Sequence, residues 1–590
     1  MARSFASLAA VAIVLAGVTS SLAAARSFSD SCGDVAARTD AGLVCGRRRA
    51  HQYSLYASFR GIPYAKPPLN ELRFQAPQPV EPWKDYLNAT VEGPICPQQT
   101  IFYGPLMEPR GMDEDCLTIN VHTPMDAFIE VQDAAPPEVD LVPPYRAGEV
   151  RRNFTGVPIV VWIHGGGFGF GSGDSDVYGP EYLVAKGVMV VTFNYRLGAL
   201  GFLSLNTSAV PGNAGLRDML AALRWVRRNG ARFGGDVSQV TLAGHSAGAA
   251  AAHLLTLAPA TQGMELFHKA VLMSGAAARG FVASSPVYAA FAAETFLQML
   301  GVNGSDPEQA RRELQAAPAE RLHDVAALLQ DLFGLSVFYP VVEAPHAGVE
   351  PVLDDDPEAL VSKGRGSDIP LMIGFTENEW ESFRPRFVEI SIVDILQMKE
   401  EVLLPPGVLY KSDPKDLKSK LDLVKARYFP NNETTLDEFG QLLTESYFQY
   451  PALFTAQRRL ALGGAPAFLY QFSYRGEHRA IENQGFQYGG AVHLEDVLYV
   501  FKVNSKAQIP DEKLQDSTDS KMQHWMTMLF TDFMRTGSPV GADRSADAWP
   551  PVRAGDFRYQ DIRAPELRML NLTAAQREMV QFYENLYSNS

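Results

Sequence analysis

Six short apolar runs, each continuous and rich in Val, Ile, Leu and aromatic residues, constrain the fold of this chain most strongly. Such runs are typical of strands that are buried on both faces. Ala- and Leu-rich helical stretches separate them, and this alternation predicts an α/β fold with a mostly parallel central sheet and helices on both of its faces. The runs are VPIVVWIHGGG, GVMVVTFNYR, SQVTLAGHSAG, KAVLMSG, IPLMIGFTENE and APAFLYQFSY.

Helical spacing is clearest between the second and third runs. Within residues 211–236, Leu220, Leu223 and Trp225 share one side while arginines face water, and the helix is expected to end at Asn229 and Gly230. Two later stretches, 281–358 and 382–438, are mainly amphipathic helix. We expect them to be insertions that roof the carboxyl edge of the sheet and so create an active-site gorge.

The length and composition favour one large domain. The 590 residues are 46% hydrophobic, which is ample for a core, and we expect a single domain over residues 26–590. A proline-rich break at about 125–156 predicts a flexible surface loop. The formal net charge of −15, without a long basic run, argues against nucleic acid as a partner.

The first 25 residues have the pattern of a signal peptide. Arg3 precedes an apolar stretch around Leu8 to Val18, and Ala23 and Ala25 suit signal peptidase, so the mature chain is expected to begin near Arg26. A membrane anchor is the alternative, but the apolar run is too short and too broken by Ser, Thr and Gly to cross a bilayer. The pattern predicts a secreted, extracellular protein with no stable membrane anchor.

Sequons and cysteines fit that location. An even number of cysteines in an oxidising compartment favours two local bridges, Cys32 with Cys45 and Cys96 with Cys116, over unpaired buried thiols. Their spacing does not match a zinc site. Several of the N-x-S/T sequons are expected to carry glycans; they begin at Asn88, Asn153, Asn206, Asn303, Asn432 and Asn571.

The sequence GHSAG at 244–248 predicts a nucleophilic serine. It follows a strand-like run and precedes a helix rich in alanine, so the flanking glycines would allow a sharp turn that pushes the Ser246 oxygen outward. The alternative is a chance serine in a glycine-rich turn. The positive end of the following helix would face the serine.

A second glycine-rich segment, HGGGFGFGS at 164–172, also follows a strand. We assign the backbone N–H groups of Gly166 and Gly167, with that of Ala247, as donors to an oxyanion. A flexible loop or a phosphate cradle is the alternative, but the segment lacks the Lys and Ser/Thr of a phosphate loop.

The general base is expected downstream of Ser246, after an acidic residue. We favour His493, because it lies in a loop that follows two glycines and enters an apolar segment. His524 is interpreted as a packing residue of an amphipathic helix, His478 lies among charges, and His346 precedes the expected acid.

The acid is less well defined by the residues alone. Glu377, Glu379 and Glu381 all follow the strand-like run PLMIGFT, and their alternation leaves the choice open. The run at 353–358, LDDDPE, is interpreted as a helix cap. His245 and His253 are interpreted as structural.

These residues carry a family likeness over nearly the whole mature chain. The matching stretches are FRGIPYAKPPLNELRF, EDCLTINVHTP, VWIHGGGFGFGS, NYRLGALGFL, PGNAGLRD, ARFGGDVSQVTLAGHSAG, GFTENEW and GGAVHLEDVLYVF. The chain resembles the type-B carboxylesterase family, most of all a secreted insect carboxylesterase. The resemblance implies an α/β-hydrolase fold, a triad of Ser246, Glu379 and His493, an oxyanion hole at Gly166, Gly167 and Ala247, and a disulfide between Cys96 and Cys116.

Departures from the family pattern bear on the substrate. Cholinesterase-like members have a Trp in the first disulfide loop and an acidic residue before the serine, whereas this loop has no Trp and the neighbour is His245. Juvenile hormone esterases have Gln at that place. Asp218 and Met219 replace the usual Asp-Gln pair. A neutral, fairly apolar ester is therefore the expected small-molecule substrate.

The predicted chemistry is hydrolysis of carboxylic esters through an acyl-enzyme on Ser246, with no metal or other cofactor. A catalytically silent secreted adhesion or recognition protein on the same fold is the alternative from another class. A lipase acting on long triglycerides is the second enzymatic alternative. The sequence makes no prediction of the oligomeric state.

Overall fold

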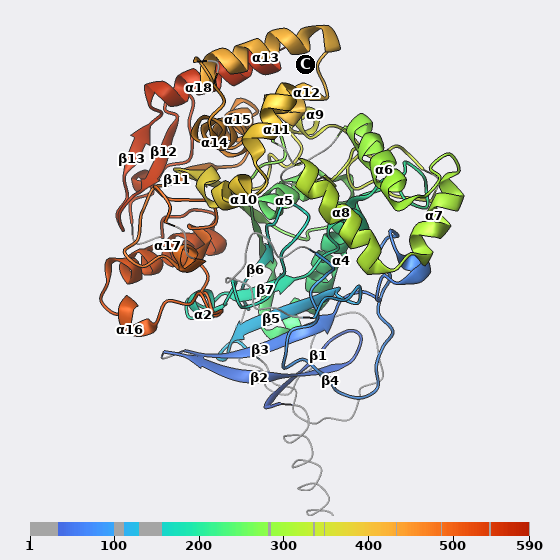
Figure 1. The fold of residues 1–590 in the computed structure, drawn as a ribbon. Coiled ribbons are helices and arrows are strands. Elements are labelled where there is room, and N and C mark those ends of the chain that lie inside the picture. Colours follow the sequence, from blue (N-terminus) through green and yellow to red (C-terminus); the bar gives the residue numbers. More distant parts are fainter. Residues whose placement is uncertain are drawn as a thin grey trace, which may run out of the picture.

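A computed structural model of the chain describes residues 33–52, 54–98, 111–128, 156–280, 285–333, 337–346, 348–431, 433–484, 487–541 and 544–588. Figure 1 shows their arrangement. The predicted signal peptide at 1–25 and residues 129–155 of the predicted flexible loop lie outside the described residues.

One sheet runs through the molecule, in the order β1-β2-β3-β5-β7-β6-β8-β9-β10-β11-β12-β13, with β4 beside β2. The strands from β7 through β12 pair in parallel, while β1, β2, β3 and β5 pair antiparallel at one end and β13 pairs antiparallel at the other. The mostly parallel α/β sheet predicted from the sequence is confirmed. The strands are β1 (Val35–Arg38), β2 (Leu43–His51), β3 (Ser54–Pro63), β4 (Leu87–Asn88), β5 (Thr118–Pro124), β6 (Val157–Ile163), β7 (Met189–Phe193), β8 (Gly235–His245), β9 (Lys269–Met273), β10 (Leu371–Thr376), β11 (Ala467–Phe472), β12 (Arg558–Ile562) and β13 (Met569–Asn571).

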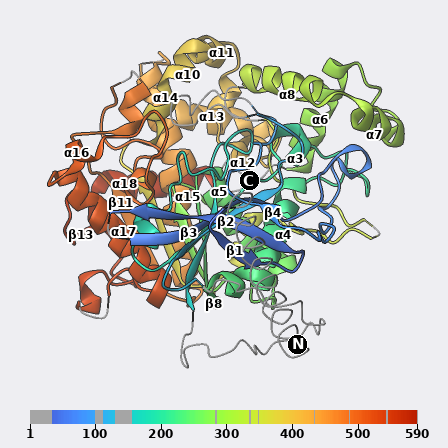
Figure 2. The same ribbon diagram turned by 90° about the horizontal axis from the view of Figure 1, so that it is seen from below.

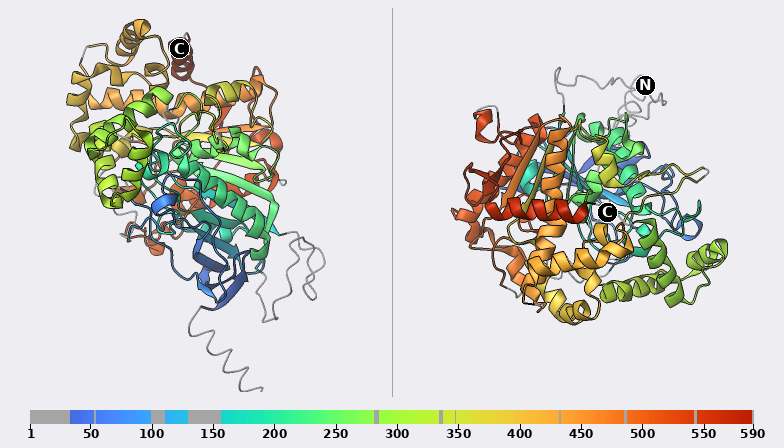
Figure 3. Two further views of the ribbon diagram at one scale, coloured as in Figure 1. Left: turned by 90° about the vertical axis from the view of Figure 1, so that its right-hand side faces the viewer. Right: turned by 90° about the horizontal axis from the view of Figure 1, so that it is seen from above.

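The central strands are buried on both faces because successive side chains of a strand point to opposite sides. On β6, Ile159, Val161 and Ile163 join one hydrophobic core, whereas Val160 and Trp162 join a second. The six apolar runs of the sequence became β6 to β11. The left view of Figure 3 shows the sheet with helices on both sides.

Different helices cover the two faces. On the first, α5 (Ala247–Leu257) packs on β6, β8 and β9 and contacts α4 (Ala214–Asn229). On the second, α17 (Thr518–Thr536) packs on β6 and β8, and α2 (Glu181–Val184) packs on β5 and β7. Helix α4 ends at Asn229, as predicted, and continues into a short 3-10 turn, Gly230–Phe233.

The predicted helical insertions are present. The first group follows β9 and comprises α6 (Pro286–Leu300), α7 (Pro307–Ala316), α8 (Ala319–Phe333) and α9 (Pro357–Ser362). The second follows β10 and comprises α10 (Arg384–Glu389), α11 (Ile392–Met398), α12 (Pro406–Leu409), α13 (Pro414–Tyr428) and α14 (Leu436–Leu443). In Figure 1, α6, α7 and α8 (green) lie on the right of the sheet, whereas α11, α12 and α13 (yellow to gold) lie in the upper part of the view, away from β1 to β4.

The remaining helices close the fold around the sheet. They are α3 (Gly198–Phe202), α15 (Tyr450–Ala461), α16 (Asp511–Leu514) and α18 (Ala574–Tyr587). Figure 2, from below, shows β1, β2 and β3 at the end of the sheet that is nearest the viewer. Among the described residues, every helix is too short or too polar to cross a membrane.

Candidate active site

Ser246 lies at a strained turn between a strand and a helix. Strand β8 ends at His245 and α5 begins at Ala247, so Ser246 alone connects them. Its backbone has φ 57° and ψ −126°, which is rare for a residue with a side chain. The Ser246 N–H donates to the carbonyl oxygen of Met273 at 2.8 Å, and this bond holds the turn against β9.

The two glycines of the GHSAG sequence are explained by close backbone approach. A Cβ atom at Gly244 would lie 2.5 Å from the carbonyl carbon of Gly248. A Cβ atom at Gly248 would collide with the carbonyl oxygen of Ile163 at the end of β6. Larger residues would therefore separate α5 from β6 and β8 and open the turn that carries Ser246.

The structure brings His493 and Glu379 together. The His493 Nδ1 and the Glu379 Oε2 lie 2.6 Å apart, and both side chains are almost fully buried. The Thr376 N–H donates to the other Glu379 oxygen at 2.7 Å. Of the three glutamates that the residues alone left open, Glu379 is the one that lies against His493, and it is also the one that the family resemblance implies.

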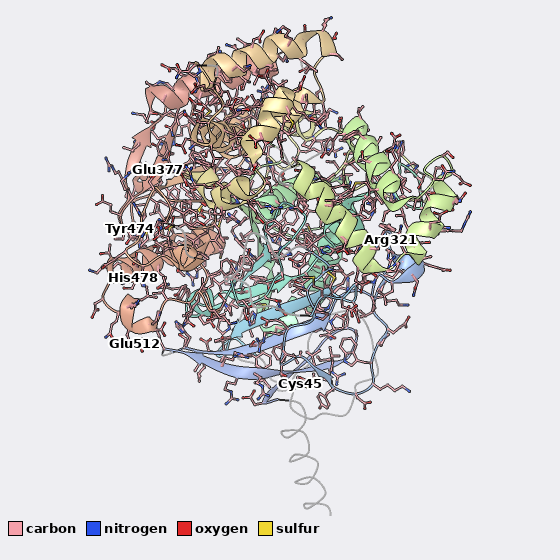
Figure 4. All side chains as sticks on the ribbon, in the orientation of Figure 1. Cys45, Arg321, Glu377, Tyr474, His478 and Glu512 are labelled. Carbon is pink, nitrogen blue, oxygen red and sulfur yellow. A yellow bond between two sulfur atoms is a disulfide. The ribbon has the colours of Figure 1, made fainter. Side chains whose placement is uncertain are left out.

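The other two glutamates pair elsewhere. The Glu377 Oε1 lies 3.1 Å from an Arg563 nitrogen. Glu377 is labelled on the left of Figure 4. Glu381 forms a two-bond ion pair with Arg384, at 2.6 and 2.7 Å. Neither carboxylate is within hydrogen-bond contact of His493 among the described residues.

Burial sets the protonation of the His493–Glu379 pair. It lowers the pKa of His493 to about 3, because the charged imidazolium loses its hydration. Burial raises the pKa of Glu379 to about 7, although the Thr376 N–H opposes that rise. The resting imidazole is therefore neutral; with its Nδ1 hydrogen donated to Glu379, its Nε2 is left as an acceptor.

A second ion pair braces the loop of His493. The Nε and one terminal nitrogen of Arg479 donate to Glu495, at 2.6 and 2.5 Å, and Glu495 also accepts from the Val492 N–H at 3.0 Å. Between the two pairs, Leu494 adopts φ 80°, a region that favours glycine. The loop is thus fixed on both sides of His493.

Three aromatic rings from three elements surround the His493 imidazole. The ring centroid of His245 lies 4.3 Å away, that of Phe448 4.8 Å and that of Phe383 5.1 Å. Phe448 comes from a π-helical turn, Thr444–Gln449, and Phe383 from a 3-10 turn, Glu379–Phe383. Sequence reasoning missed both phenylalanines, because these contacts join distant segments and have no local signal.

The glycine loop after β6 is a tight turn with two residues at positive φ. Gly166 has φ 116° and Gly167 has φ 59°. The N–H groups of Gly169 and Phe170 turn back to the Gly166 carbonyl oxygen, at 2.9 and 3.1 Å. The N–H groups of Gly166, Gly167 and Ala247 have no acceptor within the described part of the chain, so they are available to a ligand.

The disulfide between Cys96 and Cys116 lies beside this loop. The bond is present, and the Gln98 side chain connects the Cys96 carbonyl oxygen to both backbone groups of Gly171. Cys45 is also disulfide-bonded, on the lower strands in Figure 4, while its predicted partner Cys32 lies outside the described residues.

The remaining predicted residues are sequon asparagines and histidines outside the His493–Glu379 pair. Asn88, Asn206, Asn303 and Asn571 are exposed, and Asn153 and Asn432 lie outside the described residues. The predicted packing role of His524 is not what the structure has: its side chain is exposed on α17, near the Lys186 ammonium. The His253 Nδ1 accepts from the Ala277 N–H at 3.1 Å, a structural contact.

His478 and His346 have other contacts. His478, labelled on the left in Figure 4, donates its backbone N–H to Asp519 of α17, and His346 sits in a small turn with Val349. Asp356 in the acidic run caps α9, as the sequence indicated. Within the described residues, no group of three or more His, Cys, Asp or Glu side chains is arranged to hold a metal ion.

Comparison with known proteins gives a consistent result. The model of the carboxylesterase family matches residues 33–581. The chain is 42% identical to a juvenile hormone esterase of Heliothis virescens, over 94% of this chain and 95% of that protein. It is 33% identical to the para-nitrobenzyl esterase of Bacillus subtilis, over 83% and 88%.

The fold comparison agrees. The structure of the juvenile hormone esterase of Manduca sexta, with OTFP covalently attached, superposes with a TM-score of 0.86 at 43% identity, covering 94% of this chain and 99% of that one.

Proposed function

The chain belongs to the carboxylesterase family and is a carboxylic ester hydrolase; on that premise, we propose that it works through an acyl-enzyme on Ser246, with His493 as general base and Glu379 as the orienting acid. The observation that carries this proposal is the 2.6 Å bond between Glu379 and a neutral, buried His493. The ring of His245, the residue before Ser246, lies against the same imidazole.

The first half-reaction forms an ester on the enzyme. The Nε2 of His493 takes the proton from the Ser246 hydroxyl as its oxygen bonds to the substrate carbonyl carbon. The N–H groups of Gly166, Gly167 and Ala247 stabilise the negative oxygen of the tetrahedral intermediate. The C–O bond to the alcohol then breaks, and the alcohol leaves with the proton from His493.

The second half-reaction reverses these roles with water. His493 takes a proton from a water molecule as the water oxygen bonds to the acyl carbon, and the same N–H groups stabilise the oxyanion. The bond to Ser246 breaks, the serine recovers its proton from His493, and the carboxylic acid is released. Only the chain's own residues move protons in this scheme.

We propose a neutral, fairly apolar ester as the substrate. The groups around His493 are mostly uncharged rings, which favour burial of apolar surface over binding of a cation. Two relatives are named juvenile hormone esterases, so juvenile hormone is included among the test substrates. This chain has His245 where such enzymes have glutamine, so the rate on juvenile hormone is to be compared with the rates on other esters.

We also propose that the enzyme is secreted and glycosylated. The support is the signal-peptide pattern, the disulfide between Cys96 and Cys116, and the exposure of the four described sequon asparagines. Expression in insect cells tests both points. A secreted enzyme should be recovered from the medium, and glycosidase treatment of that fraction should increase its electrophoretic mobility.

The test of the mechanism compares Ser246→Ala with Ser238→Ala. Ser238 lies on the same strand and its hydroxyl bonds Asp236, well away from the turn, so it is a matched control. The Ser246 variant should lose ester hydrolysis by at least about 1,000-fold and lose labelling by an organophosphate, whereas the control should keep both. Labelling of a different residue in the wild type would contradict the assignment.

The same preparations separate the competing functions. A folded wild-type protein that neither hydrolyses esters nor takes the label would favour an adhesion or recognition protein. A sharp rise in rate when the ester passes from solution into emulsion would favour a lipase.

A further inference from the structure

His245 is a buried imidazole whose polar atoms are unused. Its side chain has no exposed surface, and neither Nδ1 nor Nε2 has a hydrogen-bond partner among the described residues. Leaving a buried polar group without a hydrogen-bond partner destabilises the fold. A hydrogen-bonding role in the resting fold therefore does not explain this side chain, and its ring contacts do.

The ring lies against both halves of the site. Its centroid is 4.3 Å from that of His493, with the two planes at 44°. On the oxyanion loop, a Cβ atom at Gly165 would lie 3.1 Å from the His245 Nδ1. His245 is thus packed between the loop of Gly166 and the predicted base, and it precedes Ser246 in the chain.

We propose that His245 is a positioning residue for the base: its uncharged ring face fixes the orientation of the His493 imidazole and stabilises the positive charge that this ring carries during acyl transfer. This inference rests on the proposed function of the site. It adds a role for a fully buried residue that acts through His493.

The charge balance of the step supports this role. When the Ser246 oxygen bonds to the carbonyl carbon, its proton moves to the His493 Nε2, and the imidazole becomes a cation away from water. A cation within about 6 Å of an aromatic face is attracted by the ring quadrupole. His245 takes no proton, because burial and the neighbouring His493 lower its pKa well below the usual range.

Other titratable groups around His493 are few. Glu379, at the start of the 3-10 turn after β10, bonds its Nδ1. On its own loop, Glu495 is paired with Arg479, and Asp496 accepts from the Tyr470 hydroxyl of β11 at 2.9 Å. The other groups that contact the His493 ring are three uncharged rings: His245 from β8, Phe383 and Phe448. The ring of His245 is the nearest of the three.

The test compares His245→Phe with His245→Leu. Both variants remove the unpaired nitrogens, but only Phe keeps an aromatic face. We expect Leu to lower kcat by roughly 5- to 10-fold with KM nearly unchanged, and to move the acid limb of kcat/KM to lower pH, since the imidazolium loses an attractive face. Phe should recover most of kcat and the position of that limb.

The control is His253→Leu, which removes another buried imidazole that bonds the Ala277 N–H. It should lower stability without moving the acid limb. Rates are normalised to sites titrated with an organophosphate, so that misfolded protein does not count. If His245→Leu behaves as wild type, or if Phe is as slow as Leu, the inference is wrong.

A second variant tests the same role in case His245→Leu does not fold. Phe448→Leu removes the next nearest ring and should also lower kcat and shift the limb to lower pH; an unchanged profile would overturn the role of the ring faces. The proposed function fails separately, when Ser246→Ala keeps the activity of the wild type.

Discussion

Two buried carboxylates flank the His493 loop with similar geometry and different consequences. Glu379 lies 2.6 Å from His493 and Glu495 lies 2.5 Å from Arg479, and neither side chain has more than a few per cent of its surface exposed. The partner makes the difference: arginine stays charged, whereas the imidazole is neutral at rest and can gain and lose a proton. Distance and burial alone therefore do not mark a catalytic pair.

The largest expected effect comes from Glu379→Gln. The amide keeps the shape but no longer favours the correct tautomer and orientation of His493, so kcat should fall by about 1,000- to 10,000-fold. The free energy of unfolding should change far less. Steady-state kinetics and urea denaturation of the same samples measure both; a variant with near-normal kcat would remove Glu379 from the mechanism.

Breaking the other pair should affect stability first. Arg479→Met leaves the Glu495 carboxylate buried and unpaired, which should lower the free energy of unfolding by about 3–5 kcal/mol. The double variant Arg479→Met/Glu495→Leu should recover much of that loss, because the fully buried carboxylate is removed with its partner, while Glu482, which also bonds Arg479, is partly exposed. If the single and double variants melt alike in urea, the pair is not what braces the loop.

The pH dependence of kcat/KM tests whether the Glu379–His493 pair takes up a proton. The acid limb of kcat/KM reports one proton taken up by the Glu379–His493 pair. In Glu379→Gln, the carboxylate no longer favours the imidazolium, and burial already lowers the pKa of His493 to about 3, so the limb of the residual activity should move to lower pH by more than about one unit. A limb that stays in place would assign the titration to another group.

The smallest effects are expected at the two glutamates that alternation could not distinguish from Glu379. Glu377→Gln breaks an exposed pair with Arg563, which is worth about 0–1 kcal/mol. Glu381→Gln breaks a more buried pair with Arg384, but Arg384 keeps Asp437 as a second, exposed partner. Their kcat should stay within about 2-fold of the wild type. A loss comparable with that of Glu379→Gln would show that the acid has been assigned to the wrong residue.

Local pattern was enough to predict the frame of the molecule. The apolar runs became strands, and Ser246 and the glycine loop could be proposed as site residues because strand, turn and helix are adjacent in the sequence. The choice among the glutamates needed more, because β10 ends at Thr376 and a 3-10 turn follows, so strand alternation no longer applies at Glu379. The family resemblance supplied that residue, and the fold gave the reason.

Contacts between distant segments could not be predicted. The pair of Arg479 and Glu495 looks like any surface charges in the sequence, and Phe448 and Phe383 resemble ordinary core residues. His245 was interpreted as structural, locked beside the serine, and its contact with the His493 ring appears only when the loop returns to the end of β8. His524 was assigned to packing because its helix is amphipathic, but it falls on the exposed side.

The bond between His493 and Glu379 joins residues 114 positions apart, and the serine lies farther back still. Such distant segments meet late when a chain refolds, since closing long loops costs entropy before the contacts form. Recovery of esterase turnover should consequently lag behind the return of helical circular dichroism after dilution from denaturant. The recovery of esterase activity would then report when the tertiary structure around His493 and Glu379 is complete.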